Sequence, residues 1–400
     1  YIGGIIGRLA WSDYSHYPYT KNIDIENATI SGKTYVGGIL GYGRIYYLQA
    51  NNVNVEGTYY IGGISGYAFT NNGWSNISNS EINGTESYIG GIAGYHDGVH
   101  DCDVNNCKIL GTGANSSYIG GIGGTVAGGA VWCSVTNSVI EGRGSNVGGI
   151  HGYQGSIQQS FVYNTEITGY SNVGGIIGQL TTYSGAMGNS YVNAKIYAIS
   201  NNVGGLVGYA NNINANGVSR TTANQSAVYN STIEGKSNVG GIIGEMVEEP
   251  QDLTWFYRNY VEAKIYGDES STSLGIGSNE QYNALIKDLY FYKYSKINNV
   301  FPNVQNEVFI PENAYLVEND LKEQQTYTSK LKWTTSYWNF NSLTDNKYPI
   351  LSSSYLTGQV EIDIPKDSEH IIETTESSIE TQNESINEQL EKIFEYDNKR

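Results

Sequence analysis

The sequence predicts an all-β protein, a β-solenoid built as a right-handed parallel β-helix of about nine or ten coils. Three observations lead to this fold class. A glycine-rich pattern recurs about every 30 residues, two short segments rich in β-branched residues fill each interval, and the composition favours turns and strands. Glycine supplies 50 of the 400 residues and proline only 6, while 35 tyrosines make up most of the aromatic residues.

The first half of each repeat reads aromatic residue or Asn, Ile or Val, two glycines, Ile or Leu, any residue, and Gly. Its first copy spans residues 1–7, and a worn copy at 273–277 closes the series. Each glycine pair is expected to mark a bend where a side chain would collide with the neighbouring coil. The structural glycines named on this basis are Gly37, Gly38, Gly62, Gly63, Gly90, Gly91, Gly148 and Gly149.

The second half of each repeat reads Ile or Val, any residue, Asn, two residues, and Ile, as at 25–30 and 104–109. Neither half is long enough for a helix, and the alternation of apolar and polar residues gives each segment one inward face. One repeat alone cannot bury that face, whereas stacked coils bury a continuous column of Ile and Val. The solenoid is therefore expected to occupy residues 1–279.

Two columns of side chains follow from the register of the repeats. The position two residues before the first glycine holds Tyr1, Tyr35, Tyr60, Tyr88 and Tyr118, and then Asn146, Asn172, Asn202 and Asn238. The position five residues after that glycine holds Tyr42, Tyr67, Tyr95, Tyr153 and Tyr209, an interrupted aromatic column. Both columns can serve to fix the register of the coils. The second column is also the candidate binding surface for a glycan or a protein.

The period is lost after residue 279. Residues 280–357 are rich in aromatic and apolar side chains and are expected to cap the open end of the rod. Residues 358–378 have the composition of an acidic linker, and 379–400 carry the spacing of a short amphipathic helix that leads to a missing downstream region.

Charge and hydropathy exclude two classes of partner. The net charge of −17 argues against binding to nucleic acid, and no run of 18 apolar residues is present to span a membrane. The chain begins at Tyr1 in the middle of a repeat, so we expect a piece of a longer polypeptide. We expect it to be monomeric.

The repeat resembles the GLUG repeat of secreted and cell-wall proteins of Gram-positive bacteria. In particular, residues 1–357 are similar to the non-catalytic β-helical region of the immunoglobulin A protease family of zinc metallopeptidases, and 327–351 resemble the element that closes those repeats. The resemblance implies an extracellular protein, secreted or associated with the cell wall. Its expected partner is a host protein, such as immunoglobulin, or a glycan.

Those peptidases carry a His-Glu-x-x-His helix, in which two histidines bind zinc and the glutamate activates water. These 400 residues contain no such motif, so no catalytic, cofactor-binding or metal-binding residue is assigned here. Zinc is expected only in a catalytic domain outside this segment. The favoured function is a non-catalytic spacer and recognition arm of such a peptidase, and the alternative is the stalk of a surface adhesin.

A third function, polysaccharide lyase or glycosidase, requires carboxylates gathered on one face of the rod. The acids fall about one to a coil beside the second strand, which is typical of a solvated face, although those at equivalent positions would form a column of like charges. They are Glu26, Glu56, Glu81, Glu141, Glu166 and Glu234.

The remaining candidates for a metal site or a disulfide are histidines and cysteines. His96, His100 and Cys102 lie in one dense segment that reads as a solvated loop rather than a metal site, and His151 occupies a variable position where it is expected to be tolerated. Cys102 and Cys133 are 31 residues apart and share a column. Stacked strands lie within reach of a disulfide, and two buried, unbonded thiols are the alternative.

Overall fold

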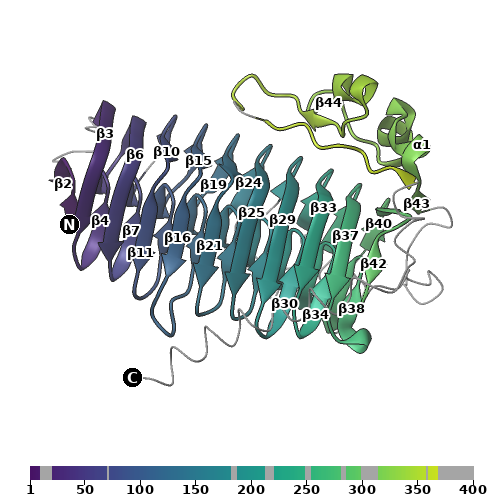
Figure 1. Cartoon of the computed structure of the whole chain (residues 1–400), viewed down its shortest axis with the longest axis horizontal. Coiled ribbons are helices and arrows are strands. Elements are labelled where there is room, and N and C mark those ends of the chain that lie inside the picture. Colours follow the sequence, from purple (N-terminus) through teal and green to yellow (C-terminus); the bar gives the residue numbers. More distant parts are fainter. Residues whose placement is uncertain are drawn as a thin grey trace.

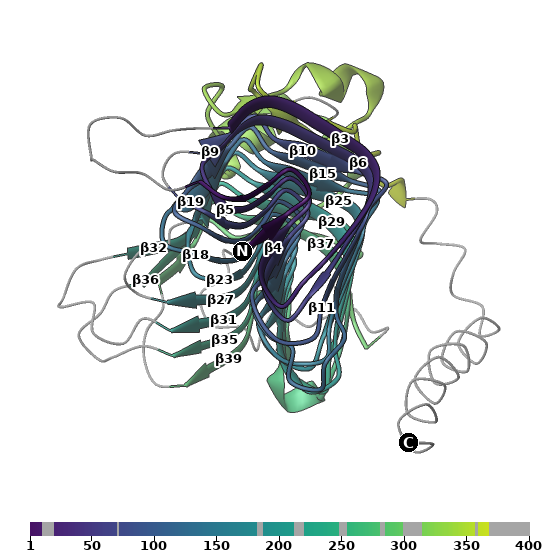
Figure 2. The same ribbon diagram turned by 90° about the vertical axis from the view of Figure 1, so that its left-hand side faces the viewer.

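The computed structural model describes residues 1–9, 20–69, 72–181, 187–211, 220–247, 254–280, 285–298, 314–356 and 359–367. Within these ranges the chain winds into a parallel β-solenoid, and successive coils add strands to three long sheets that run along the rod (Figures 1 and 2). The strands of the three sheets pair in parallel. The predicted fold class is confirmed, and the hand of the coil stays a prediction.

Sheet A carries the first half of each repeat up to the first glycine. It consists of β1 (Ile2–Gly3), β4 (Thr34–Gly37), β7 (Tyr59–Gly62), β12 (Ile89–Gly90), β17 (Ile119–Gly120), β22 (Val147–Gly148), β26 (Val173–Gly174), β30 (Asn201–Gly204), β34 (Ser237–Gly240) and β38 (Thr272–Ser273). Sheet B follows each glycine pair. It consists of β2 (Ile6–Arg8), β5 (Leu40–Gly43), β8 (Ser65–Ala68), β13 (Ala93–His96), β18 (Gly123–Val126), β23 (His151–Tyr153), β27 (Ile177–Thr181), β31 (Val207–Asn211), β35 (Ile243–Val247) and β39 (Ile276–Glu280).

Sheet C carries the second half of each repeat. Its strands in the first five coils are β3 (Thr20–Ser31), β6 (Ile45–Gly57), β9 (Asn72–Gly73), β10 (Asn76–Ser78), β11 (Glu81–Gly84), β14 (Val99–His100), β15 (Asp103–Asn105), β16 (Lys108–Gly111), β19 (Gly129–Val131), β20 (Ser134–Thr136) and β21 (Val139–Gly142). Its later strands are β24 (Ser156–Gln158), β25 (Phe161–Gly169), β28 (Met187–Gly188), β29 (Tyr191–Ala198), β32 (Arg220–Asn224), β33 (Ala227–Glu234), β36 (Thr254–Tyr257), β37 (Tyr260–Tyr266), β40 (Leu285–Lys287), β41 (Tyr290–Tyr292), β42 (Lys296–Ile297) and β43 (Tyr315–Leu316).

The number of complete turns is slightly smaller than the nine or ten coils expected. Sheets A and B have ten strands each among the described residues, and eight strands of each sheet have a neighbouring strand on both sides. The solenoid also continues past residue 279, because β40, β41 and β42 extend sheet C by pairing with β36 and β37. These strands lack the glycine pair, which is why the sequence pattern ends before the coils do.

The glycine pairs allow successive coils to nest. Gly37 pairs with Gly62 in register, and Gly62 pairs with Gly90. A Cβ atom on Gly37 would lie 2.7 Å from the Ser65 Cα atom, and one on Gly38 would lie 2.1 Å from the Gly63 carbonyl oxygen, and both of these atoms belong to the next coil. Any larger residue would therefore force the coils apart.

Most coils turn at three corners, and at each of these corners one residue adopts the left-handed backbone conformation. The first corner precedes the sheet A strand, as at Tyr88 (φ 70°), and the other two divide sheet C, as at Trp74 (φ 49°) and Asn79 (φ 51°). Inside the coils, Ile and Val from all three sheets form one continuous buried cluster that extends from Ile30 to Ala314.

The C-terminal cap lies along the side of the rod, over sheet C of the later coils, and not over the open end as expected (Figures 1 and 2). Its elements are a helical turn α1 (Glu318–Leu321), a π-helical turn η3 (Thr326–Lys330), a 3₁₀ turn η4 (Asn341–Asp345), and the antiparallel pair β44 (Trp338–Asn339) and β45 (Ile350–Leu351). A further 3₁₀ turn, η1 (Glu269–Ser271), belongs to the last coils. The cap docks sideways because outward aromatic residues such as Phe161, Tyr191 and Tyr260 share one apolar cluster with it.

The cap also extends beyond its expected boundary. Ile362 and Ile364, assigned to the acidic linker, are buried in the cap, and the Tyr348 amide donates to the Ile362 carbonyl at 2.8 Å. The rest of the expected linker from residue 368, and the expected helix at 379–400, lie outside the described residues. No helix in the described part of the chain is long and apolar enough to cross a membrane.

Candidate functional site

A stack of five tyrosine rings runs along the first corner of coils one to five. Neighbouring ring centroids lie 4.6 to 5.2 Å apart, and neighbouring planes are within 16° of parallel. Tyr1 is 50% exposed at the end of the stack, and the other four rings are half-buried. The members are Tyr1, Tyr35, Tyr60, Tyr88 and Tyr118.

The backbone under this stack is strained. Tyr35, Tyr60, Tyr88 and Tyr118 have φ between 53° and 70°, a left-handed conformation that bulky side chains rarely adopt. The later coils place Asn146, Asn172, Asn202 and Asn238 at the same corner with φ between 54° and 66°. Asn is among the residues that tolerate this conformation best. Since Asn suits the corner and Tyr does not, strain at four successive tyrosines makes this corner a candidate functional site.

The candidate column from sheet B lies beside the stack for only part of its length. The rings of Tyr42, Tyr67 and Tyr95 stack with centroids 5.0 and 4.3 Å apart, and Tyr42 also meets the edge of Tyr1 at 5.2 Å. Thr125 then occupies the column, and Tyr153 turns its ring edge-on to Tyr118 at 5.1 Å.

Tyr209 stands apart from the other four candidates. It lies between Gln179 and Glu245 in the register, and its hydroxyl accepts a hydrogen bond from the Asn211 amide at 3.5 Å. The structure therefore joins Tyr42, Tyr67, Tyr95 and Tyr153 to the corner stack in one surface, which we call the tyrosine surface, and leaves Tyr209 outside it.

Two groups of opposite charge act on the tyrosine surface, Arg8 and Asp97. The Arg8 guanidinium lies 5.1 Å from the ring centre of Tyr1 and 5.7 Å from that of Tyr42. Burial raises the pKa of Tyr67 and of Tyr95 above the ordinary value, and the Asp97 carboxylate contributes to both shifts. These hydroxyls therefore stay protonated at neutral pH and can both donate and accept hydrogen bonds.

The asparagines of the first corner form a hydrogen-bonded ladder. The amides of Asn172, Asn202 and Asn238 donate in turn to the preceding side-chain oxygen at 2.8, 2.9 and 2.9 Å, beginning with the Oδ1 atom of Asn146. Because each amide is used within the ladder, this half of the corner is structural, as the sequence reading allowed.

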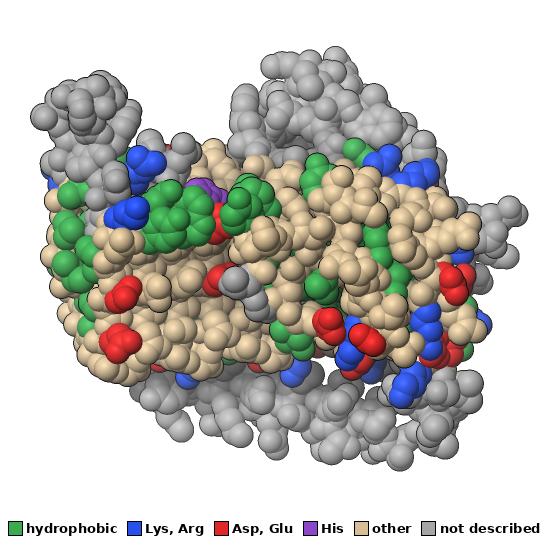
Figure 3. Space-filling view, turned by 90° about the horizontal axis from the view of Figure 1, so that it is seen from above, with side chains coloured by type: hydrophobic (Ala, Val, Ile, Leu, Met, Phe, Trp, Pro, Cys, Tyr) green, Lys and Arg blue, Asp and Glu red, His purple; other side chains and the backbone are tan. Residues whose placement is uncertain are grey.

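An aromatic cluster at the second corner was missed by the sequence reading. Tyr47 stacks on Trp74 with centroids 5.0 Å apart, Trp74 meets His100 at 4.3 Å, and Lys21 lies 5.3 Å from the centre of Tyr47. Figure 3 shows hydrophobic side chains beside a histidine on this face of the rod. The sequence held a signal for this cluster, because Tyr47 and Trp74 lie about one repeat apart. In the structure Tyr46 pairs with Gly73, which aligns Tyr47 with Trp74.

The histidine-rich segment is not the loop that was expected. His96 ends β13 and Val99–His100 form β14, so the two histidines point to opposite sides of the coil wall. His100 lies near the surface with its Nδ1 atom 2.6 Å from an Asp101 carboxylate oxygen. Among the described residues, no three His, Cys, Asp or Glu side chains are close enough together to hold a metal ion.

His96 and His151 form a buried pair inside the solenoid. Both side chains have no exposed surface, and their Nε2 atoms lie 3.1 Å apart, across Gly123 of the intervening coil. Burial lowers the pKa of both rings below the ordinary value. His151 is thus a specific partner of His96 and not merely a tolerated side chain.

The three cysteines are free and buried. Asp103 pairs with Ser134, which places Cys102 beside Cys133 in the column as expected, and Cys107 aligns with Ser138. In these columns Ser is the commonest residue, and its oxygen accepts the amide hydrogen of the preceding coil, as from Cys107 to Ser138 at 3.1 Å. The thiols therefore occupy positions in a serine ladder.

The carboxylates do not form the column of like charges suggested by the sequence. Glu81 pairs in register with Asn54 and Lys108, and Glu166 pairs with Val139 and Lys195. Neutral or basic residues therefore separate the acids along the rod, and these pairings do not create the opposed carboxylates that glycoside hydrolysis requires.

No family model matches the chain, and no curated protein matches it. Among solved structures, the chain is similar to the crystal structure of a putative immunoglobulin A1 protease from Bacteroides ovatus, with 14% identity and a TM-score of 0.39. The match covers 81% of this chain and 86% of that chain.

Proposed function

We propose that this chain is a non-catalytic spacer and recognition module of a secreted or cell-surface bacterial protein, with the tyrosine surface as its binding site. The observation that carries the proposal is the left-handed backbone of Tyr35, Tyr60, Tyr88 and Tyr118 at a corner where later coils have Asn. Ring stacking offsets this strain within the protein, and the half-buried rings leave edges and hydroxyl groups at the surface.

The geometry suits a host protein, such as immunoglobulin, or a glycan. Phenol hydroxyls donate and accept hydrogen bonds, ring edges supply apolar contact, and Arg8 and Asp97 add one charge of each sign. The parallel coils suit a spacer, because each adds about 4.8 Å to a rod whose strands are fixed by their neighbours. Whether the parent is an immunoglobulin A protease-like zinc metallopeptidase or an adhesin is tested by searching the parent gene for His-Glu-x-x-His.

Surface plasmon resonance of the purified chain against immobilised immunoglobulin A, together with a glycan array, tests the binding function. A triple variant, Tyr60→Asn with Tyr88→Asn and Tyr118→Asn, keeps the corner conformation and removes three rings. We expect binding to weaken at least about tenfold, which corresponds to the loss of about 1.4 kcal/mol.

Tyr47→Asn is the matched control, because Tyr47 is also left-handed (φ 54°) and exposed but lies at the second corner. We expect this control to bind as the unmodified chain does. Equal loss in both variants, or no binding to either probe, would contradict the proposed surface. Hydrolysis of peptide or polysaccharide by the purified chain would contradict a non-catalytic role.

A further inference from the structure

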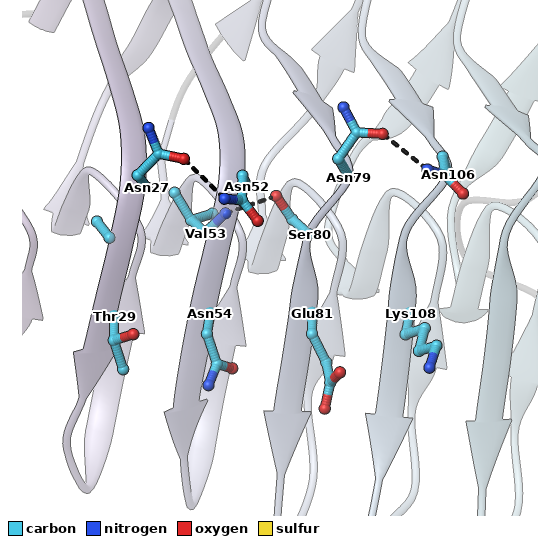
Figure 4. Close-up of a pocket in the computed structure, with 11 residues that line it drawn as sticks. Asn27, Thr29, Asn52, Val53, Asn54, Asn79, Ser80, Glu81, Asn106 and Lys108 are labelled. Carbon is cyan, nitrogen blue, oxygen red and sulfur yellow. Dashed lines mark hydrogen bonds between the residues drawn. The ribbon is translucent and has the colours of Figure 1, made fainter.

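A shallow groove of about 590 Å³ crosses the first four coils on the outer face of sheet C (Figure 4). It runs across the strands and therefore along the rod. Two parallel rows of polar side chains form its walls, and Ala28, Val53 and Ser80 lie between the rows. The groove is at the third corner, and the tyrosine surface is at the first.

The upper wall consists of four amides that are only partly paired with one another. Asn52 donates to Asn27, and Asn106 donates to Asn79, both at 2.7 Å, but Asn79 donates to Asn51 and not to Asn52. Among the described residues, no group donates to the Oδ1 atoms of Asn52 and Asn106. The wall therefore offers spare acceptors two coils apart.

The lower wall places Thr29, Asn54, Glu81 and Lys108 side by side in register. The Asn54 amide donates to Glu56 at 3.1 Å, which leaves the Asn54 Oδ1 atom without a partner. Within the described part of the chain, Lys108 makes no ion pair with Glu81. The row ends where Val139 follows Lys108.

We infer that this groove binds an extended, hydroxyl-rich glycan chain whose axis follows the rod. Its walls present the unpaired acceptor oxygens of Asn52 and Asn106 together with the donors of Lys108 and Thr29, the complement that sugar hydroxyls require. Three strand spacings of about 4.8 Å give a groove of about 14 Å, a length that suits a short run of sugar residues.

Two observations favour a glycan with uncharged sugars over an extended peptide. The floor is the face of a sheet whose backbone groups pair with the neighbouring coils, so an added peptide strand would find no free edge there. Glu81 and Lys108 carry opposite charges, so these two wall residues contribute no net charge to select an ionic ligand.

Isothermal titration of the whole chain with hexasaccharides of β-1,4-linked glucose, xylose or N-acetylglucosamine tests this inference. We expect one of these probes to bind. The double variant Asn54→Ala with Lys108→Ala should weaken that binding about tenfold, as expected for the loss of one or two hydrogen bonds. The control, Lys195→Ala with Thr232→Ala, changes the same register column outside the groove and should leave binding unchanged.

Unchanged circular dichroism would show that the groove variant folds, and Asn52→Gly provides a second variant that keeps a left-handed corner (φ 52°). Failure of all three probes to bind would overturn the inference, as would equal weakening in groove and control variants. Loss of hexasaccharide binding in the tyrosine variant alone would place the sugar on the tyrosine surface and overturn the groove. Loss in the groove variants alone would support the groove whatever the tyrosine surface binds.

Discussion

The hydroxyl of Tyr348 in the cap donates a 2.8 Å hydrogen bond to the carboxylate of Glu262 in the solenoid. The backbone N–H of Asn230 donates to the same carboxylate oxygen at 3.2 Å, and the hydroxyl oxygens of Tyr260 and Tyr348 lie 2.9 Å apart. Glu262 is 8% exposed, and its burial raises the pKa to about 7 despite these hydrogen bonds. A titratable group therefore lies between the rod and its cap.

Cap docking should weaken as the pH rises. The folded protein holds the Glu262 proton more tightly than the unfolded chain, in which the pKa of glutamate is near 4.5. The stabilisation that this proton gives to the folded state is therefore complete below pH 4.5, and it is lost as the pH rises through about 7. The difference approaches about 3 kcal/mol. Urea unfolding followed by the fluorescence of Trp333 and Trp338, which stack at 4.1 Å in the cap, measures it.

Glu262→Gln is the control for this titration, because it keeps the shape of the side chain and cannot ionise. The difference in unfolding free energy between the variant and the unmodified chain should change between pH 5 and pH 7.5. A constant difference would show that Glu262 does not titrate in this range.

One position that recurs in successive coils of sheet C indicates where the cap lies, although the position of the cap was not predicted. In coils one to five, one outward position of sheet C holds polar residues such as Asn76, Asp103 and Ser134. From coil six this position holds apolar or aromatic residues, namely Phe161, Tyr191, Ala227 and Tyr260. The change marks where the cap covers the sheet. The glycine spacing predicted the coils because it is a local backbone constraint. The cap depends instead on contacts between residues far apart in the sequence, such as Tyr348 and Glu262, which are 86 residues apart.

The buried histidine pair should make the protein less stable in acid. Burial lowers the pKa of His151 to about 3 and that of His96 well below 6.5, so the folded state keeps both rings neutral while the unfolded chain binds protons. Stability is therefore complete above pH 6.5 and falls as the pH drops toward 3, by about 1.4 kcal/mol for each ring per pH unit.

His151→Ile provides the measurement, because Ile177 occupies the same position in the next coil. The variant should lose stability less steeply than the unmodified chain between pH 6 and pH 4.5, as followed by urea unfolding monitored by circular dichroism. An identical pH slope in the two proteins would mean that His151 does not stay neutral in the folded state.

The serine ladder should be sensitive to loss of its hydroxyl groups. Ser160 accepts the Cys133 amide hydrogen at 3.1 Å and donates to the Gln158 carbonyl at 2.9 Å. Ser160→Val removes both bonds inside the core and should lower the free energy of unfolding by about 1–3 kcal/mol. Cys133→Ser introduces the commonest residue of the column and should change the free energy of unfolding by less. Thermal unfolding compares the two, and equal losses would contradict the ladder.

The tyrosines of the tyrosine surface could be named from the sequence, but the property that sets them apart could not. Spacing alone placed Tyr60 and Tyr88 in one column, since the repeat fixes the register. It did not show that their corner is left-handed, nor that Asn52 and Asn79 leave the third-corner ladder broken, because both depend on dihedral angles and side-chain rotation.

Replacement of Tyr88 should separate strain from stacking at the first corner. Its ring lies between Tyr60 and Tyr118 at 4.6 and 5.2 Å, and its φ is 70°. Tyr88→Asn removes two stacking contacts of about 1 kcal/mol each. It also relieves backbone strain of about 1 kcal/mol, so the free energy of unfolding should fall by about 1 kcal/mol in total. Tyr88→Ala loses the same contacts and stays strained, so it should be the less stable variant. Urea unfolding measures the free energy of unfolding of the two variants. Equal values would show that the corner imposes no backbone strain on tyrosine.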